Sequence, residues 1–138
     1  MSDLTRNFSS REFACKHCGA LRLDPALPAA LQALRDLAGR PIIVLSGYRC
    51  PDHPEEHRKT TPGMHAQGKA ADVLLQGHTL RRAYDLAAAL GLFGGIGIYD
   101  GGFLHLDLRP TPARWGRLAG VYVPFSRAAA ILFPRPLQ

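Results

Sequence analysis

Two histidines and one aspartate have the residue types and spacing of a catalytic zinc site. His65 and Asp72 lie in one segment rich in glycine and alanine, and His105 lies in a later apolar segment. Three protein ligands with nitrogen or oxygen donors leave a fourth position for water, whereas structural zinc sites usually have four protein ligands. Bound zinc lowers the pKa of its water toward about 7 and polarises a carbonyl oxygen. These residues therefore predict zinc as the cofactor of an amide hydrolase.

Asp107 and Arg49 are the predicted catalytic partners of this metal. Side chains alternate across a strand, so Asp107 lies on the face of His105 if residues 103–109 are extended. Asp107 is then either the general base that activates water or a residue that orients His105. Arg49 can hold a substrate carboxylate or the oxyanion that forms during hydrolysis, and its alternative is a surface ion pair.

The cysteines predict a second metal site of a different kind. There are three of them, and an odd number argues against a simple disulfide framework. Cys15 and Cys18 belong to a Cys-Lys-His-Cys sequence, and Cys50 comes three residues before His53. These four residues, or the same cysteines with His17, form the ligand set of a closed structural zinc site. The alternative is three reduced cysteines without a metal.

The helices and strands that must position these residues can be predicted from hydrophobic periodicity and from the residues that begin or end such elements. Four leucines, the last of them Leu37, recur at helical spacing after Asp24, which predicts a helix with one apolar face that ends at Gly39. A second helix is predicted from Thr79 to Leu90. Strands are predicted at 41–45, 70–75, 96–99 and 103–109, with a hairpin turn at 100–102.

The remaining segments are predicted as loops or as peripheral elements. Residues up to 23 form loops and turns that Phe8 and Phe13 anchor on the core, and residues 46–64 form a long loop. In the tail from 117 to 138, residues 121–123 fit an edge strand and residues 127–133 a short helix or docking segment.

The composition is that of a globular chain with excess positive charge. At 138 residues we expect one domain, 1–138, and a monomer by default. The net charge of +6 favours an acidic partner such as the bacterial wall, but the basic residues form no stripe with interleaved aromatics, so nucleic-acid binding is not predicted. Neither a membrane span nor a secretory signal is found, and we expect a cytoplasmic protein as synthesised.

Four motifs in a fixed order resemble the zinc D-Ala-D-Ala carboxypeptidase family, which is related to VanX-type dipeptidases, phage L-alanyl-D-glutamate endopeptidases and the hedgehog signalling domain. The resemblance covers roughly residues 7–116 and extends to the opening stretch 7–15 and to Trp115, as in the small phage and bacterial branch. The motifs are Ser46-Gly47-Tyr48-Arg49, His65-x-x-Gly68-x-Ala70-x-Asp72, Gly-Ile-Gly-Ile-Tyr at 95–99 and Phe-Leu-His-Leu-Asp at 103–107.

This resemblance implies an α+β fold with a central antiparallel sheet and flanking helices, and zinc bound by His65, Asp72 and His105. It also implies cleavage of peptide bonds in peptidoglycan stem peptides or cross-links, with Arg49 in contact with substrate. The expected setting is a phage lysis enzyme (an endolysin), a tail-associated wall hydrolase or a protein exported without a signal peptide. Many relatives carry Asp or Glu three residues before the last zinc histidine, where this chain has Gly102.

The lack of a carboxylate at position 102 supports an alternative: a catalytically inactive zinc-binding domain of the same fold that recognises the cell wall or a protein partner. A third interpretation is a structural virion component in which zinc serves folding alone.

Overall fold

The computed structural model describes residues 2–57, 59–61 and 63–134. In this part the chain forms six strands and three α-helices, preceded by a 3-10 turn at Ser10–Glu12. The strands are β1 (Ile42–Ser46), β2 (Ala70–Leu75), β3 (Gly95–Tyr99), β4 (Leu104–Asp107), β5 (Ala113–Leu118) and β6 (Val121–Pro124). The helices are α1 (Ala26–Ala38), α2 (Leu80–Leu90) and α3 (Phe125–Leu132). The predicted α+β class is confirmed.

All six strands belong to one sheet in the order β1-β2-β4-β3-β5-β6. Neighbouring strands pair antiparallel except β3 and β5, which pair parallel. The central strands β1, β2, β4 and β3 are therefore antiparallel, as expected, and the parallel pairing of β5 with β3 makes the sheet as a whole mixed. The reason is topological: β4 occupies one edge of β3, and the chain then crosses to the free edge of β3, where the amide of Ala113 bonds the carbonyl of Gly94 at 2.9 Å.

Helix α1 forms where the leucine repeat predicted it. The Asp24 carboxylate accepts a hydrogen bond from the amide of Ala26 at 2.9 Å, and Gly39 ends the helix in the left-handed conformation at φ 68°. Leu34 is fully buried, but Leu37, predicted on the same face, is 50% exposed. At 3.6 residues per turn Leu37 is rotated about 80° from the first leucine of the repeat, so it lies beyond the edge of the buried stripe.

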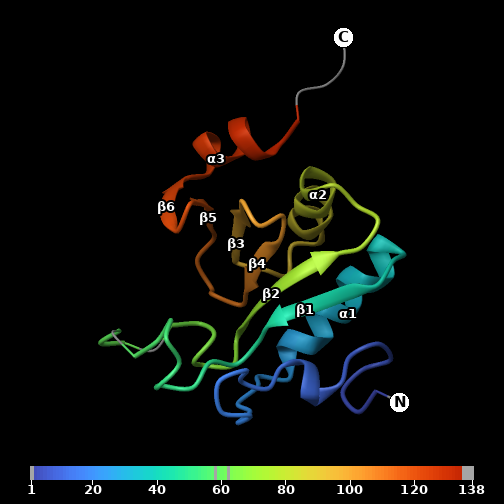
Figure 1. The fold of residues 1–138 in the computed structure, drawn as a ribbon. Helices are drawn as coiled ribbons and strands as arrows, with labels where there is room; N and C mark the ends of the chain where they lie inside the picture. The colour runs from blue at the N-terminus through green and yellow to red at the C-terminus, as the bar shows by residue number, and fades with distance from the viewer. Residues whose placement is uncertain (1, 58, 62, 135–138) are drawn as a thin grey trace.

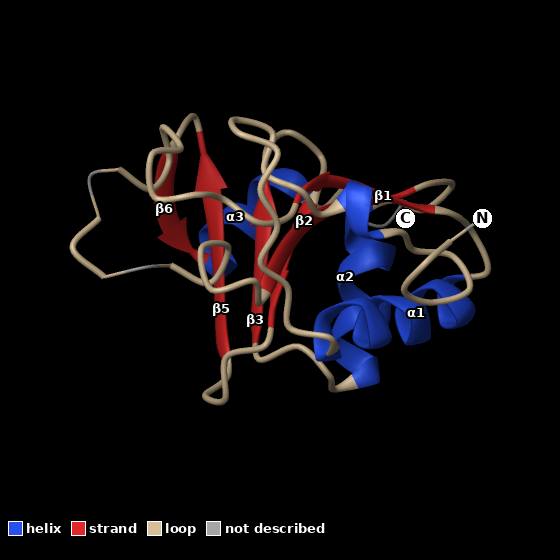
Figure 2. Cartoon of the chain, turned by 90° about the horizontal axis from the view of Figure 1, so that it is seen from below, coloured by secondary structure: helices blue, strands red, loops and turns tan. Residues whose placement is uncertain are grey.

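The helices and the candidate ligands lie on opposite faces of the sheet. Along β4, the side chains of Leu104 and Leu106 belong to the hydrophobic core, so His105 and Asp107 must point away from it. Helices α1 and α2 lie side by side on the core face, and α3 packs against β3 and β5 (Figures 1 and 2). The polar face of the same strands is left free for a site.

The N-terminal segment holds the beginning of the long loop between β1 and β2. Phe8 and Phe13 are almost fully buried, as predicted. The amide of Tyr48 bonds the carbonyl of Phe13 at 2.8 Å, and a Cβ atom on Gly47 would lie only 2.7 Å from the Phe13 backbone. A glycine at position 47 therefore permits a close approach between two segments that are far apart in sequence (Figure 1).

The last elements extend the sheet. The predicted edge strand at 121–123 and helix at 127–133 correspond to β6 and α3, whereas β5 was not predicted. Residues 135–138 of the predicted tail lie outside the described residues. Among the residues that are described, no helix has both the length and the apolar composition needed to cross a bilayer.

Candidate metal centre

The three predicted zinc ligands converge at one point on the polar face of the sheet. Asp72 on β2 and His105 on β4 are directly opposite each other in the antiparallel register, and His65 comes from the end of the long loop. One potential ligand atom from each residue lies within 4.8 Å of the other two, and all three side chains are buried. The sheet register therefore brings together residues that are 33 positions apart in sequence.

The protonation pattern around His65 fits a cation. Its Nδ1 lies 2.7 Å from the carbonyl oxygen of Gly47, an acceptor, so Nδ1 carries the proton. Its Nε2 is then a bare lone pair, buried without a hydrogen-bond partner among the described residues and 3.3 Å from Oδ1 of Asp72. Burial lowers the pKa of His65, which keeps the ring neutral. Two acceptors facing each other at this distance repel unless a cation lies between them.

The second histidine directs its Nδ1 to the same place. Nδ1 of His105 lies 3.1 Å from Oδ1 of Asp72, and its Nε2 lies 2.7 Å from Oδ2 of Asp107. Burial would raise the pKa of Asp72, but the contacts of its carboxylate with the rings of His105 and His65 outweigh burial and hold that pKa well below its usual range. A neutral nitrogen from each ring and a charged carboxylate form a donor set that suits zinc, so the residues present fit the metal.

Asp107 is enclosed rather than open to the pocket. Its side chain is fully buried, and both oxygens accept hydrogen bonds. Arg109 supplies its backbone amide at 3.0 Å and Nε at 2.9 Å to Oδ1, and a terminal nitrogen at 2.6 Å to Oδ2, which His105 also contacts. Despite burial, the partners His105 and Arg109 hold the pKa of Asp107 well below its usual range. Of its two predicted roles, this geometry fits the orientation of His105 better than proton transfer.

Arg49 lies inside the site and not in a surface ion pair. Its terminal nitrogen donates to Oδ2 of Asp72 at 2.9 Å, and its Nε donates to the hydroxyl of Ser46 at 3.2 Å. Its backbone amide bonds the carbonyl of His65 at 3.3 Å. The guanidinium therefore holds the carboxylate oxygen that does not face the histidines, while its side chain remains 15% exposed and lines the pocket.

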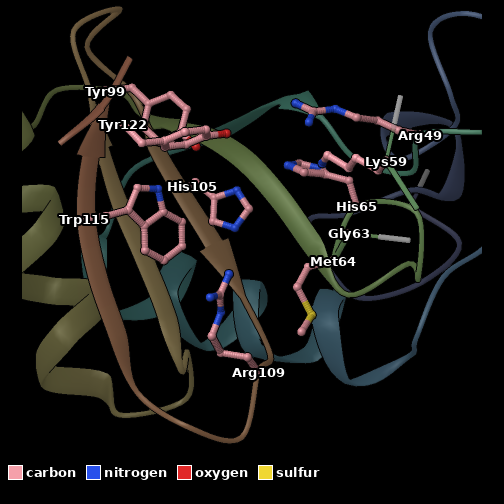
Figure 3. Close-up of a pocket in the computed structure, with 10 residues that line it drawn as sticks. All are labelled: Arg49, Lys59, Gly63, Met64, His65, Tyr99, His105, Arg109, Trp115 and Tyr122. Carbon is pink, nitrogen blue, oxygen red and sulfur yellow. The ribbon is translucent and has the colours of Figure 1, made fainter. Parts of the chain in front are cut away.

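The site opens into a pocket of about 340 Å³. Figure 3 shows an aromatic side facing a cationic side across His105. Tyr99 on β3, Trp115 on β5 and Tyr122 on β6 supply the aromatic rings. Arg49 and Lys59 from the loop lie opposite, and Arg109 lies below with its guanidinium 4.7 Å from the centre of the Trp115 ring.

The sequence did not assign Lys59, Tyr122 or the two other aromatic rings to the pocket. The alternation that places Asp107 beside His105 also predicts Arg109 on that face, and Arg109 does line the pocket. No such signal exists for Tyr122, because its place in the pocket depends on β5 pairing with β3.

The three cysteines also come together, at a point separate from the His65, Asp72 and His105 cluster. Single sulfur atoms of Cys15, Cys18 and Cys50 lie within 4.8 Å of one another, and all three cysteines are free. Burial acts to raise the pKa of Cys15, but the backbone amides of Cys50, Cys18 and His17 outweigh it and lower that pKa to about 7. His17 lies closer to this cluster than expected, with Nδ1 3.5 Å from Sγ of Cys50, whereas Nδ1 of His53 accepts the amide of Glu55 at 3.0 Å.

Comparison with known families supports the site as a whole. Residues 2–107 match the model of a family described as peptidase M15, and this range includes His65, Asp72 and His105. No curated protein matches the chain significantly. Because the match covers more than half of the sequence and spans a histidine–aspartate–histidine cluster with the donor set of zinc, the chain belongs to the M15 peptidases, a family of zinc-dependent metallopeptidases.

Proposed function

We propose that this protein is a zinc peptidase that hydrolyses peptide bonds in the stem peptides or cross-links of peptidoglycan, as a D,D-carboxypeptidase or an endopeptidase. The observation that carries the proposal is the convergence of His65, Asp72 and His105 beside a pocket open to solvent that both histidines line. Three ligands from the protein leave a coordination position for water or substrate, which a purely structural zinc site does not need.

The residues that would hold zinc are His65 through Nε2, Asp72 through Oδ1 and His105 through Nδ1. Bound there, the metal supplies an acidic water and a Lewis acid for the scissile carbonyl. Asp107 keeps the proton of His105 on Nε2 and fixes the plane of the ring, so the Nδ1 lone pair is directed toward Asp72. Positioning by such partners contributes to both metal affinity and rate.

Arg49 has two tasks in this proposal. It neutralises the oxygen of Asp72 that faces away from the histidines. Its remaining N–H groups are available to a substrate in the pocket. An arginine fork matches a carboxylate or a developing oxyanion, and it keeps its charge at any physiological pH. Substrate would therefore bind between Arg49 and the aromatic side of the pocket.

The charge of the pocket favours an anionic peptide. Its lining includes Arg49, Lys59 and Arg109, and it includes no carboxylate among the described residues. Stem peptides of the bacterial wall carry free carboxylates, and the net charge of +6 favours approach to an anionic polymer. Trp115 and the two tyrosines offer flat apolar surfaces against which a short, constrained peptide can pack.

The test is release of stem peptides from purified peptidoglycan, with fragments identified by mass spectrometry. The wild type should release peptides, and both chelation and His65→Ala should abolish release, while added zinc should restore the chelated sample. His57→Ala is the matched control, because His57 is exposed and does not line the metal pocket. The fragment masses would identify the bond that is cut.

A second candidate is a zinc-binding domain that recognises wall peptides without cutting them. The specific observation in its favour is the pocket lining, in which the described residues supply no carboxylate to act as a general base. Gly102, where many relatives carry Asp or Glu, lies in the turn between β3 and β4 with φ 85°. Binding of wall fragments by folded, zinc-loaded protein, with no release from several wall types, would establish this function and contradict the first.

A further inference from the structure

A second cluster of metal-binding side chains lies apart from the pocket. Cys15 and Cys18 come from the N-terminal segment, and Cys50 comes from the residues that follow β1. Their sulfur atoms lie within 4.8 Å of one another, against about 3.8 Å between two sulfurs on tetrahedral zinc. All three are free thiols, and Cys15 and Cys50 are buried. The approach is close enough that a small contraction completes the geometry of a metal site.

The backbone around Cys15 has the form of a metal-binding knuckle. The amide of Gly19 bonds the carbonyl of Cys15 at 2.7 Å, and the amide of Cys15 bonds the carbonyl of Ala20 at 2.7 Å. Gly19 adopts φ 78°, which lets the chain reverse direction directly after Cys18. The amide of Cys50 points at the sulfur of Cys15 at 3.4 Å. An N–H group directed at sulfur stabilises the thiolate form, which is the form that binds metals.

His17 is placed to supply a fourth ligand. Its Nδ1 lies 3.5 Å from Sγ of Cys50, and a nitrogen and a sulfur on one tetrahedral zinc ion are about 3.6 Å apart. The His17 side chain is exposed, so its ring can rotate toward the other two sulfurs. His53 is the competing ligand, but its Nδ1 accepts the amide of Glu55 and its ring centre is 6.2 Å from that of His17.

We propose that Cys15, Cys18, Cys50 and His17 bind a second, structural zinc ion. Four protein ligands close the coordination sphere, so this ion does no chemistry. Its effect is to join the N-terminal segment to the loop that carries Arg49.

The position of Cys50 gives this ion a consequence for the active site. Cys50 follows Arg49 directly, and Arg49 holds Oδ2 of Asp72. The same stretch is tied to the N-terminal segment by the hydrogen bond between Tyr48 and Phe13. A metal bound to Cys50 fixes the backbone on the C-terminal side of Arg49. The backbone of Arg49 is then held on both sides, which restricts where its guanidinium can lie. The second ion thereby positions Arg49 without touching substrate.

Cobalt substitution of the whole 138-residue chain tests the proposal. Cobalt bound to thiolates gives an intense charge-transfer absorption in the near ultraviolet, and the histidine–aspartate–histidine site contains no sulfur. Reduced wild-type protein should bind two equivalents of cobalt and show this band. His65→Ala should lose one equivalent and keep the band, whereas Cys18→Ser, a change at an exposed residue, should lose the band and keep the other equivalent. This readout does not depend on peptidase activity, so it separates failure of the second site from failure of the proposed function.

Matched histidine variants test the fourth ligand. His17→Ala should lower cobalt affinity at the thiolate site at least tenfold and shift the band, while His53→Ala should leave both unchanged. Reduced wild-type protein that binds a single equivalent and shows no thiolate band would overturn the proposal without any variant. A disulfide found by thiol counting in protein purified without oxygen would overturn it as well. Loss of affinity in His53→Ala alone would overturn the assignment of His17.

Discussion

Oδ2 of Asp107 lies 2.7 Å from Nε2 of His105, on the side of the imidazole opposite Asp72. The ring therefore lies between two carboxylates, one that faces the metal position and one that fixes the tautomer. A hydrogen-bonded partner of this kind typically contributes about 10–100-fold to metal affinity.

Asp107→Asn is expected to weaken zinc binding by about 10–100-fold, because the amide no longer holds the His105 proton with a full charge. Competition with a chromophoric chelator measures the affinity, and turnover should recover when zinc is in excess. Asp52→Asn, at an exposed aspartate outside the pocket, is the control. Unchanged zinc affinity with abolished turnover would instead assign Asp107 as the general base.

Zinc binding should weaken as the pH falls, and it should do so at a higher pH than an ordinary histidine predicts. Burial alone would lower the pKa of His105, but the hydrogen bonds that its ring donates to Asp107 and Asp72 outweigh burial and raise that pKa. In the metal-free protein the proton therefore stays on the ring above the ordinary value of about 6.5, and zinc must displace it.

The dissociation constant of zinc, measured at a series of pH values, should rise as the pH drops through this raised pKa. In Asp107→Asn the loss of the charged partner should move the onset of the rise to lower pH. An affinity that is constant down to about pH 5 would contradict this coupling.

Arg49→Lys should reduce turnover by about 10–100-fold while zinc stays bound. Lysine keeps the charge but cannot contact Asp72, Ser46 and substrate through one planar group. Each hydrogen bond between charged groups that is lost costs about 1.5–3 kcal/mol. Peptide release and zinc content should be measured on the same sample. Loss of zinc in parallel with turnover would indicate that Arg49 acts only by holding Asp72.

Leu34→Ala and Leu37→Ala should have very different effects on stability, although the leucine repeat treats the two positions alike. Leu34 is fully buried, so its truncation should lower the free energy of unfolding by about 2–5 kcal/mol. Leu37 is half exposed, so its truncation should cost less than about 1 kcal/mol. Chemical denaturation of both variants measures the difference, and equal losses would contradict the packing of α1.

Most signals for the candidate metal site are local. A strand that alternates leucine with polar residues places His105 and Asp107 on one face whatever the rest of the fold does. The register that puts Asp72 opposite His105 then follows from pairing two short strands. The signals for the helix ends are equally local, because Thr79 and Gly39 cap the backbone groups of neighbouring residues.

What could not be predicted depends on contacts between distant segments. Strand β5 reads Ala-Arg-Trp-Gly-Arg-Leu and has no apolar alternation, because most of its side chains are only partly buried. Its parallel pairing with β3 was therefore missed, and with it the place of Trp115 and Tyr122. The proximity of His17 to Cys50 likewise results from how the N-terminal segment packs on the loop, which spacing does not encode.

Most of the aromatic side of the pocket comes from the last two strands of the sheet. The part of the chain that matches the family ends at Asp107, whereas Trp115 and Tyr122 follow it on β5 and β6. Two of the three aromatic residues of the pocket therefore lie outside the stretch that holds the metal ligands, whereas Arg49 and Tyr99 lie within it. Exchanging residues 113–124 between relatives should therefore change which peptides the pocket accepts and leave the metal ligands in place.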